Sequence, residues 1–130
     1  VNVVADIAAG TATRTPQEHG KATLAPMLDK ELAEFRLTDT AAHIHNWVRG
    51  MNPWPMAWFV TAGGKKVKVT ECRVAVSNGE APGTVLSTKP LTVACADGAV
   101  QLLHVVPEGK KPMDGTSFAA GLRLKAGDTL

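Results

Sequence analysis

The alternation of apolar and polar positions divides this chain into a helical first part and a strand-rich second part. Between residues 44 and 51, apolar side chains recur three and four positions apart, which is the period of one helix face. We expect this helix to be capped by Thr38 or Asp39 and to run to about Arg49. The Asn52-Pro53 step ends it, because proline cannot continue a helix and disfavours helical geometry in the residue before it.

Weaker patterns precede this helix. Residues 1–9 have apolar positions at helical spacing, and Gly10 is a natural residue to follow a helix end. Residues 10–26 show no period, so we expect an extended linker there. Residues 27–35 are compatible with a short helix after Asp29. The chain starts without an initiator methionine, and we expect it to be a fragment whose first helix needs a partner for its apolar face.

From residue 56 onward the period changes to that of strands. We predict five strands, over residues 56–61, 65–76, 83–87, 91–96 and 99–106. Gly63-Gly64 and Asp97-Gly98 are hairpin turns. In the second strand the apolar phase shifts by one residue near Thr70-Glu71, which predicts a β-bulge. Asp114 or Thr116 then caps a short C-terminal helix. A helix followed by five short strands indicates a mainly β fold, a small closed or partly open barrel.

Composition supports one globular domain. The chain has 130 residues, of which 45% are hydrophobic and 20% charged. No apolar run reaches the roughly 18 residues needed to span a bilayer, and no signal peptide opens the chain, so we expect a cytoplasmic protein that does not contact membranes. Cys72 and Cys95 lie in strand-like apolar runs, and we interpret them as buried free thiols in a reducing compartment.

All three tryptophans lie between residues 44 and 59, beside two prolines. Large aromatic side chains dominate core burial, so we interpret this stretch as a packing joint between helix and sheet. The joint residues are Trp47, Asn52, Pro53, Trp54 and Pro55. A free-standing barrel that binds a peptide through these tryptophans is a less favoured alternative.

Candidate catalytic chemistry is sparse. His43 and His45 are two positions apart on a helix, so they point in different directions and cannot share a metal ion. Neither cysteine has a neighbour at metal-binding spacing, and the sequence contains no nucleophile elbow, phosphate loop or dinucleotide fingerprint. We therefore expect no catalytic residue, no metal site and no cofactor in this chain.

The strongest functional feature is a basic hairpin. Lys65, Lys66, Lys68 and Arg73 crowd one strand, opposed only by Glu71. Lys66 and Lys68 alternate with valines, so they project from the solvated face. Arg49, Lys110 and Lys111 add to the positive charge. Two interpretations remain open at this point: a groove that follows a phosphate backbone, or lysines that protect an exposed edge strand from aggregation.

Several segments together resemble a known family. HNWVRGMNPWPMAWF, residues 45–59, resembles the joint of methionyl-tRNA formyltransferases, in which a helix ends in an R-x-x-N-P-W-P corner before the barrel. ATLAPMLDKE at residues 22–31 is similar to the family's linker, and APGTVL at 81–86 and GKKPM at 109–113 follow in matching order and spacing. The departure is Phe35-Arg36-Leu37, where family members often carry an I-D-W-like segment.

The resemblance implies a division of the chain. Residues 1–10 would be the last helix of a catalytic domain, 11–37 a linker, and 38–130 a five-stranded OB-like Greek-key barrel with a short C-terminal helix. In this family a separate Rossmann-like N-terminal domain binds the co-substrate 10-formyltetrahydrofolate and holds the catalytic Asn, His and Asp. None of these maps onto this chain, which we therefore expect to be inactive alone.

The function implied is binding of the acceptor arm of initiator methionyl-tRNA, so that the N-terminal domain can formylate the methionyl amino group in translation initiation. We also expect a monomer. The residues expected to contact tRNA are Lys30, Arg49, Lys65, Lys66, Lys68, Arg73, Lys110 and Lys111. The alternative is a structural barrel in another formyltransferase, one that acts on a nucleotide sugar or that hydrolyses or oxidises formyl-tetrahydrofolate.

Overall fold

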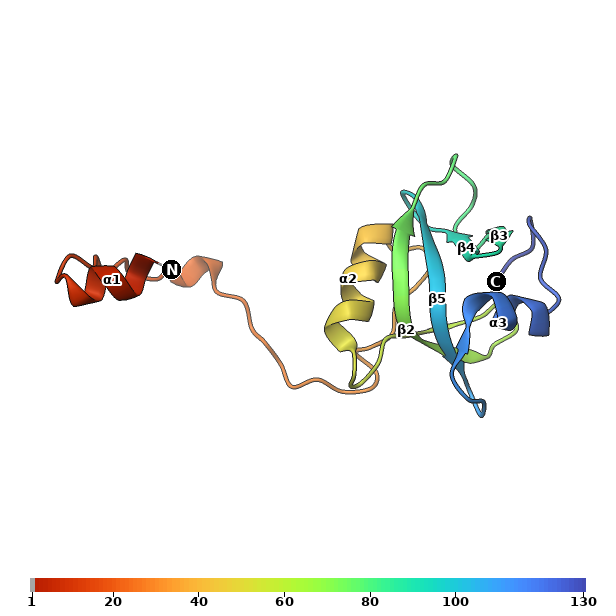
Figure 1. The fold of residues 1–130 in the computed structure, drawn as a ribbon, viewed down its shortest axis with the longest axis horizontal. Helices are drawn as coiled ribbons and strands as arrows, with labels where there is room; N and C mark the ends of the chain where they lie inside the picture. Colours follow the sequence, from red (N-terminus) through yellow and green to blue (C-terminus); the bar gives the residue numbers. More distant parts are fainter. Residues whose placement is uncertain (1) are drawn as a thin grey trace.

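A computed structural model describes residues 2–130 (Figure 1). Its helices are α1 (Asn2–Ala8), α2 (Ala41–Met51) and α3 (Gly115–Gly121), with a short 3-10 turn at His19–Lys21. Its strands are β1 (Trp58–Val60), β2 (Lys66–Ala75), β3 (Val85–Thr88), β4 (Leu91–Ala94), β5 (Ala99–Pro107) and β6 (Met113–Asp114). Figure 1 shows α1 joined to the rest of the fold by a long extended segment.

The strands form one antiparallel sheet in the order β1-β2-β5-β4-β3, with β6 added beside β5. Irregular segments pair with both edge strands. Glu34 forms a parallel bridge to Trp58 on β1, and Thr129 bridges Thr84 next to β3. The N–H of Val85 also donates to the carbonyl of Asp128 at 2.8 Å. The mainly β, barrel-like fold is thus confirmed, with six strands instead of five.

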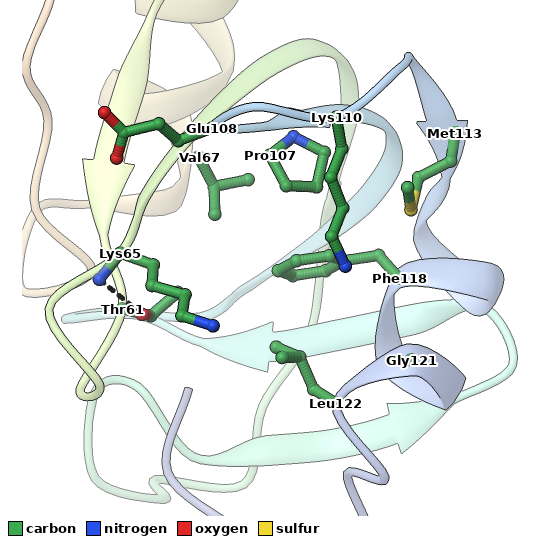
Figure 2. A pocket seen from close by; sticks show the side chains of 10 residues that line it. All are labelled: Thr61, Lys65, Val67, Pro107, Glu108, Lys110, Met113, Phe118, Gly121 and Leu122. Atoms are coloured by element: carbon green, nitrogen blue, oxygen red, sulfur yellow. Dashed lines mark hydrogen bonds between the residues drawn. The ribbon is translucent and has the colours of Figure 1, made fainter.

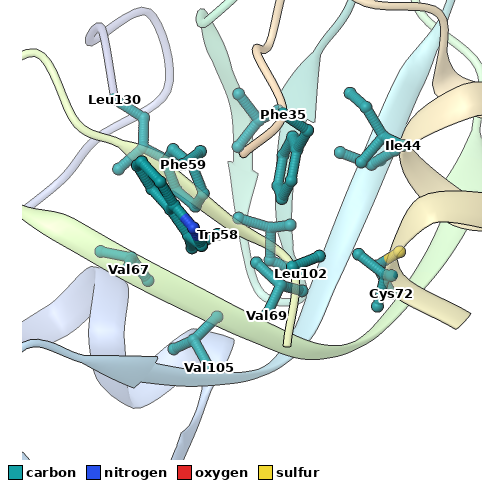
Figure 3. Close-up of a cluster of buried hydrophobic side chains, with 14 of the residues drawn as sticks. Phe35, Ile44, Trp58, Phe59, Val67, Val69, Cys72, Leu102, Val105 and Leu130 are labelled. Atoms are coloured by element: carbon teal, nitrogen blue, oxygen red, sulfur yellow. The ribbon is translucent and has the colours of Figure 1, made fainter. Parts of the chain in front are cut away.

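The core lies between the curled sheet and α2. Of the α2 face that the spacing predicted, Ile44, Val48 and Met51 are buried and Trp47 is partly buried, and Ala41 in the first turn is buried as well. Phe35 and Phe59 are both buried, with ring centroids 5.4 Å apart. Figure 3 shows apolar side chains from α2, β1, β2 and β5 meeting in this cluster. Burial of these side chains is the main stabilising contribution to the domain.

The bulge in β2 is confirmed. Its pairing with β5 shifts register between Val69 and Glu71 and again between Glu71 and Cys72. Val67, Val69 and Cys72 can therefore all face the core, while Lys66 is exposed and Lys68 half-buried on the outer face. The extra residue re-aims the strand, which is the general effect of a bulge.

The prediction of a short helix at residues 27–35 is wrong. Residues 30–33 form a turn, closed where the N–H of Leu32 donates to Asp29 Oδ1 at 2.6 Å. Beyond it the chain pairs with β1: the N–H of Phe35 donates to the carbonyl of Trp58, and the N–H of Trp58 to that of Ala33. Pairing with an open strand edge, with Ala33 and Phe35 buried, prevails over a weak local helical preference.

The expected cap of α2 is also wrong by one or two residues. Thr40 is the N-cap, and its hydroxyl accepts from the N–H of His43 at 3.2 Å. Asp39 instead accepts from the N–H of Arg36 at 2.9 Å, which closes the turn before the helix. Three candidate capping residues stand in a row, so only the backbone path decides which one is used.

Asp114 caps α3, one of the two alternatives predicted. Its carboxylate accepts from both the hydroxyl and the N–H of Ser117, and the hydroxyl hydrogen bond above all lowers the pKa of Asp114. α3 packs against the end of β5 with Phe118 and Ala119 buried. The short helix is thereby placed beside the basic hairpin of β2.

Candidate nucleic-acid interface

Three lysines line one groove on the outer face of the sheet. Lys66 and Lys68 extend from β2, and Lys110 comes from the turn after β5. The groove is about 260 Å³ in volume and is also lined by residues 106–109. Pairing of β2 with β5 brings the two walls of the groove together. Lys68 lies opposite Val106, and the N–H of Glu108 donates to the carbonyl of Lys66.

Trp58 holds one of these lysines in place. The ammonium of Lys66 lies 3.7 Å from the centre of the Trp58 ring, a cation–π contact. The indole N–H of Trp58 donates to the carbonyl of Lys30 at 2.7 Å. The same side chain therefore orients a groove lysine and anchors the backbone of the linker lysine beside it.

The groove lysines form no ion pair with a carboxylate of residues 2–130. Among residues 2–130, the side-chain ion pairs are Lys21 with Glu18, on the linker, and His104 with Glu71 at 3.7 Å. Neither pair involves Lys65, Lys66, Lys68 or Lys110. Four ammonium groups at one end of the sheet outnumber Glu108, the one carboxylate that lines the groove, and this surplus creates a positive potential that attracts an anion.

Two of the predicted contact residues lie outside this group. Arg73 is exposed beyond the bulge, opposite Gln101. Glu71 separates it from the lysines. Arg49 lies in the last turn of α2, where its guanidinium donates to Asn46 Oδ1 at 3.2 Å. Arg73 was grouped with the lysines because it lies on the same strand, and Arg49 was added as a further positive charge, but neither side chain lines the groove. Lys111 is exposed next to Lys110.

A second cavity, which the sequence did not indicate, opens next to the groove. It is about 240 Å³ in volume and shares Pro107, Glu108 and Lys110 with the groove. Figure 2 shows Phe118 of α3 and Leu122, which directly follows α3, facing Lys65 of the β1–β2 hairpin across this cavity. Met113 of β6 forms part of its wall. No local pattern could have paired residue 65 with residue 118.

The tryptophan stretch is a joint with one exposed member. Trp58 is buried at 8% exposure, and Trp47 packs against the core partly buried, its ring stacked on His43. The indole N–H of Trp47 is buried without a hydrogen-bond partner. Trp54, in contrast, is 56% exposed.

The turn between α2 and β1 adds two further contacts to this joint. Pro55 is buried, and the Asn52 amide donates to the carbonyl of Thr70 at 3.4 Å. Pro53 is exposed.

The two cysteines are free and buried, as predicted. Burial raises the pKa of Cys72 to about 11 and that of Cys95 to about 12, with the nearby carboxylates of Glu71 and Asp97 adding to the effect. Both thiols are therefore protonated at neutral pH and poor nucleophiles. Within residues 2–130, no three His, Cys, Asp or Glu side chains gather as a metal site would require, and no helix is both long and apolar enough to cross a bilayer.

The fold and the groove together define a small β domain that presents a positive surface beside a helix-to-sheet joint. Comparison with known proteins agrees with this class. The model of the "Formyl transferase, C-terminal domain" family matches residues 27–123. The chain belongs to this family.

Individual relatives give the same result. The methionyl-tRNA formyltransferase of Solibacter usitatus is 40% identical over the whole chain, and that of Jannaschia sp. 42% identical over 91% of it. The chain spans 42% and 38% of these two relatives' lengths. Among solved structures, HypX from Aquifex aeolicus superposes with a TM-score of 0.63 at 19% identity, covering 92% of this chain and 22% of HypX. At this identity the likeness establishes a shared fold.

Proposed function

We propose that this chain is the tRNA-binding portion of a methionyl-tRNA formyltransferase. It would hold the acceptor arm of initiator methionyl-tRNA while a separate N-terminal domain transfers the formyl group from 10-formyltetrahydrofolate. In this proposal residues 1–10 belong to that catalytic domain, 11–37 form the linker, and 38–130 form the binding domain. The chain alone supplies affinity and orientation and has no formyltransferase activity, and the whole enzyme acts as a cytoplasmic monomer.

The observation that carries this proposal is the groove of Lys66, Lys68 and Lys110: none of these lysines forms an ion pair within residues 2–130, and Glu108 is the one acidic residue among those that line the groove. Lysine ammonium groups along a β-sheet groove are a common way to follow a phosphate backbone. Edge protection explains this arrangement less well. β2 is an interior strand, paired with β1 on one side and β5 on the other, so its lysines have no open edge to protect.

The contacts with phosphate are expected from Lys66, Lys68 and Lys110 within the groove and from Lys65 at the adjoining cavity, with Lys30 and Lys111 at the margins. Trp58 supports this arrangement because it fixes the direction of Lys66. Arg49 and Arg73 would contribute to long-range attraction of the RNA without lining the groove.

The test is binding of initiator methionyl-tRNA across a salt series. We compare the wild-type chain with a variant in which Lys65, Lys66 and Lys68 are changed to glutamate. The control changes Lys21, Lys89 and Lys125 to glutamate, which alters the net charge equally at exposed positions outside the groove. We expect the groove variant to lose most of its affinity and its salt slope to fall by about one for each lost phosphate contact. The control should retain most of both.

Equal losses in both variants would mean that net charge and not the groove attracts the RNA. Absence of binding by the wild-type chain even at low salt would overturn the proposal. The structural role in another formyltransferase would then be the better interpretation, since the matched family is described only as the C-terminal domain of formyl transferases.

A further inference from the structure

The cavity beside the groove combines apolar walls with cationic rims. Its apolar residues are Val67, Pro107, Met113, Phe118 and Leu122. Lysine attraction for phosphate accounts for the groove but assigns no role to these apolar walls. Val67, Pro107 and Phe118 are buried at its floor, whereas Met113 and Leu122 are partly open to water, so the cavity offers a small apolar surface that a ligand can cover.

The positions of the charged groups limit what that ligand can be. In Figure 2 the side chains of Lys65 and Lys110 extend towards the cavity, whereas the carboxylate of Glu108 points away from it. A ligand would therefore meet apolar surface in the cavity and positive charge on either side of its mouth. Thr61 lies at the base of Lys65 and accepts from its backbone N–H at 3.1 Å, which holds the start of that side chain.

The volume of the cavity further limits the kind of ligand that it can hold. About 240 Å³ is below the roughly 300–1,000 Å³ typical of drug-sized ligands, so the cavity suits a single ring system. A planar ring whose faces stack on apolar side chains, flanked by negative charge on both sides, is the chemistry of a base within a nucleic-acid strand. The cavity and the groove share Lys110, so a strand lying in the groove passes the mouth of the cavity.

We propose that this cavity receives the base of one unpaired nucleotide of the bound RNA, with Lys65 and Lys110 contacting the phosphates on its two sides. This inference rests on the proposed function and names the element of the RNA that is recognised. A base within a duplex is stacked and cannot enter a protein cavity, whereas an unpaired base can turn out of the strand. The side chains of Met113 and Phe118 then cover the base.

The experiment compares RNAs that differ only in their bases. A short oligoadenylate is matched with an abasic strand of equal length, which keeps every phosphate and lacks the bases. A blunt-ended RNA duplex, in which every base is paired, reports binding by the groove alone. We expect the wild-type chain to bind the oligoadenylate at least about fivefold more tightly than the abasic strand, the lower end of what one stacked base contributes.

Two variants assign this preference to the cavity. Gly121→Leu adds a side chain at a cavity-lining position where a new Cβ would meet no atom within 4 Å. Ala120→Leu adds a side chain of the same kind at an exposed neighbouring position that does not line the cavity. We expect Gly121→Leu to lose the preference for bases while its binding of the blunt-ended duplex is unchanged, and Ala120→Leu to behave as wild type.

The outcomes separate this inference from the function on which it rests. Equal affinity of the wild-type chain for the oligoadenylate and the abasic strand, with the blunt-ended duplex still bound, would overturn the base site and leave the proposed function standing. A base preference that survives in Gly121→Leu would also overturn it, since another aromatic side chain such as the exposed Trp54 would then be responsible. Failure to bind any of the RNAs would overturn both.

Discussion

At the scale of single residues, Trp58 contacts parts of the fold that lie far apart in sequence. It is buried, its ring lies under the ammonium of Lys66, and its indole N–H donates to the carbonyl of Lys30. The linker, the core and the basic groove therefore meet at one side chain. Trp54, four residues earlier, is exposed.

We expect Trp58→Phe to lower the free energy of unfolding by about 1 kcal/mol, because it removes the hydrogen bond to Lys30 while keeping an aromatic ring in the core. Urea denaturation followed by circular dichroism measures this. Trp54→Phe is the matched control and should leave the unfolding midpoint unchanged. If both substitutions had the same effect, the bond to Lys30 would contribute nothing to stability.

Cys72 and Cys95 give the protein a pH dependence on the alkaline side. Their pKa values in the folded state, about 11 and about 12, lie above the ordinary value of 9.0. The folded state therefore favours the protonated thiols. This stabilisation is fully present below about pH 9 and is lost as the pH rises through the folded-state pKa values.

We expect the free energy of unfolding of the wild-type chain to fall between pH 8 and pH 10.5 more steeply than that of a Cys72→Ala/Cys95→Ala variant. Urea denaturation at each pH measures the difference between the two slopes. In the folded wild-type protein at pH 8, iodoacetamide should modify neither thiol. Rapid modification under native conditions would show that burial does not protect them.

At the scale of elements, β6 and α3 show how a short segment can depend on one residue. A Cβ placed on Gly115 would lie 1.8 Å from the carbonyl oxygen of Leu102 in β5. Glycine is therefore required where α3 begins, because the helix approaches the backbone of the sheet closely. This close approach places Phe118 in the core, where it also forms one wall of the cavity beside the β1–β2 hairpin.

We expect Gly115→Ala to destabilise the domain by about 1–3 kcal/mol or more, because either α3 or β5 must shift to admit the methyl group. Gly121→Ala lies in the same helix, with open space around its new Cβ, and should be neutral or slightly stabilising. Thermal unfolding of the two variants measures the contrast. Equal midpoints would contradict the close approach of α3 to β5.

The elements also show where sequence patterns succeed. The helical face of α2, the β2 bulge and the hairpin turn at residues 97 and 98 were predicted correctly because each depends on residues close in sequence. The segment of residues 27–35 was predicted wrongly because its pairing partner is β1, more than twenty residues away. β6 was missed because two residues are too few to show a period.

At the scale of the whole molecule, residues 2–32 contribute no buried side chain, and burial begins at Ala33. The exposed apolar residues of α1, namely Val3, Val4 and Ile7, have no contact with the core. The stable unit is therefore the sheet with α2, α3 and the segment from about residue 27, which is also where the family match begins.

We expect deletion of residues 1–26 to leave the thermal midpoint of the domain unchanged. Residues 2–26 contribute neither buried apolar area nor a hydrogen bond to the sheet. Differential scanning calorimetry of the shortened and full chains tests this. Deletion of residues 1–35 is the informative comparison. It removes Phe35, and with it the pairing to β1. The midpoint should then fall, and a drop already seen with the first deletion would contradict the boundary.

The sequence by itself determined what adjacent residues can specify: the α2 face, the bulge, the turns, the buried cysteines and the motif of the joint. Only the tertiary structure decided which charged side chains lie close together. It gathered Lys65, Lys66, Lys68 and Lys110 and separated Arg49 and Arg73 from them. It also placed Phe118 beside Lys65 to form a cavity. The physical reason is that closing the sheet fixes the distances between residues far apart in the chain, and no local period encodes those distances.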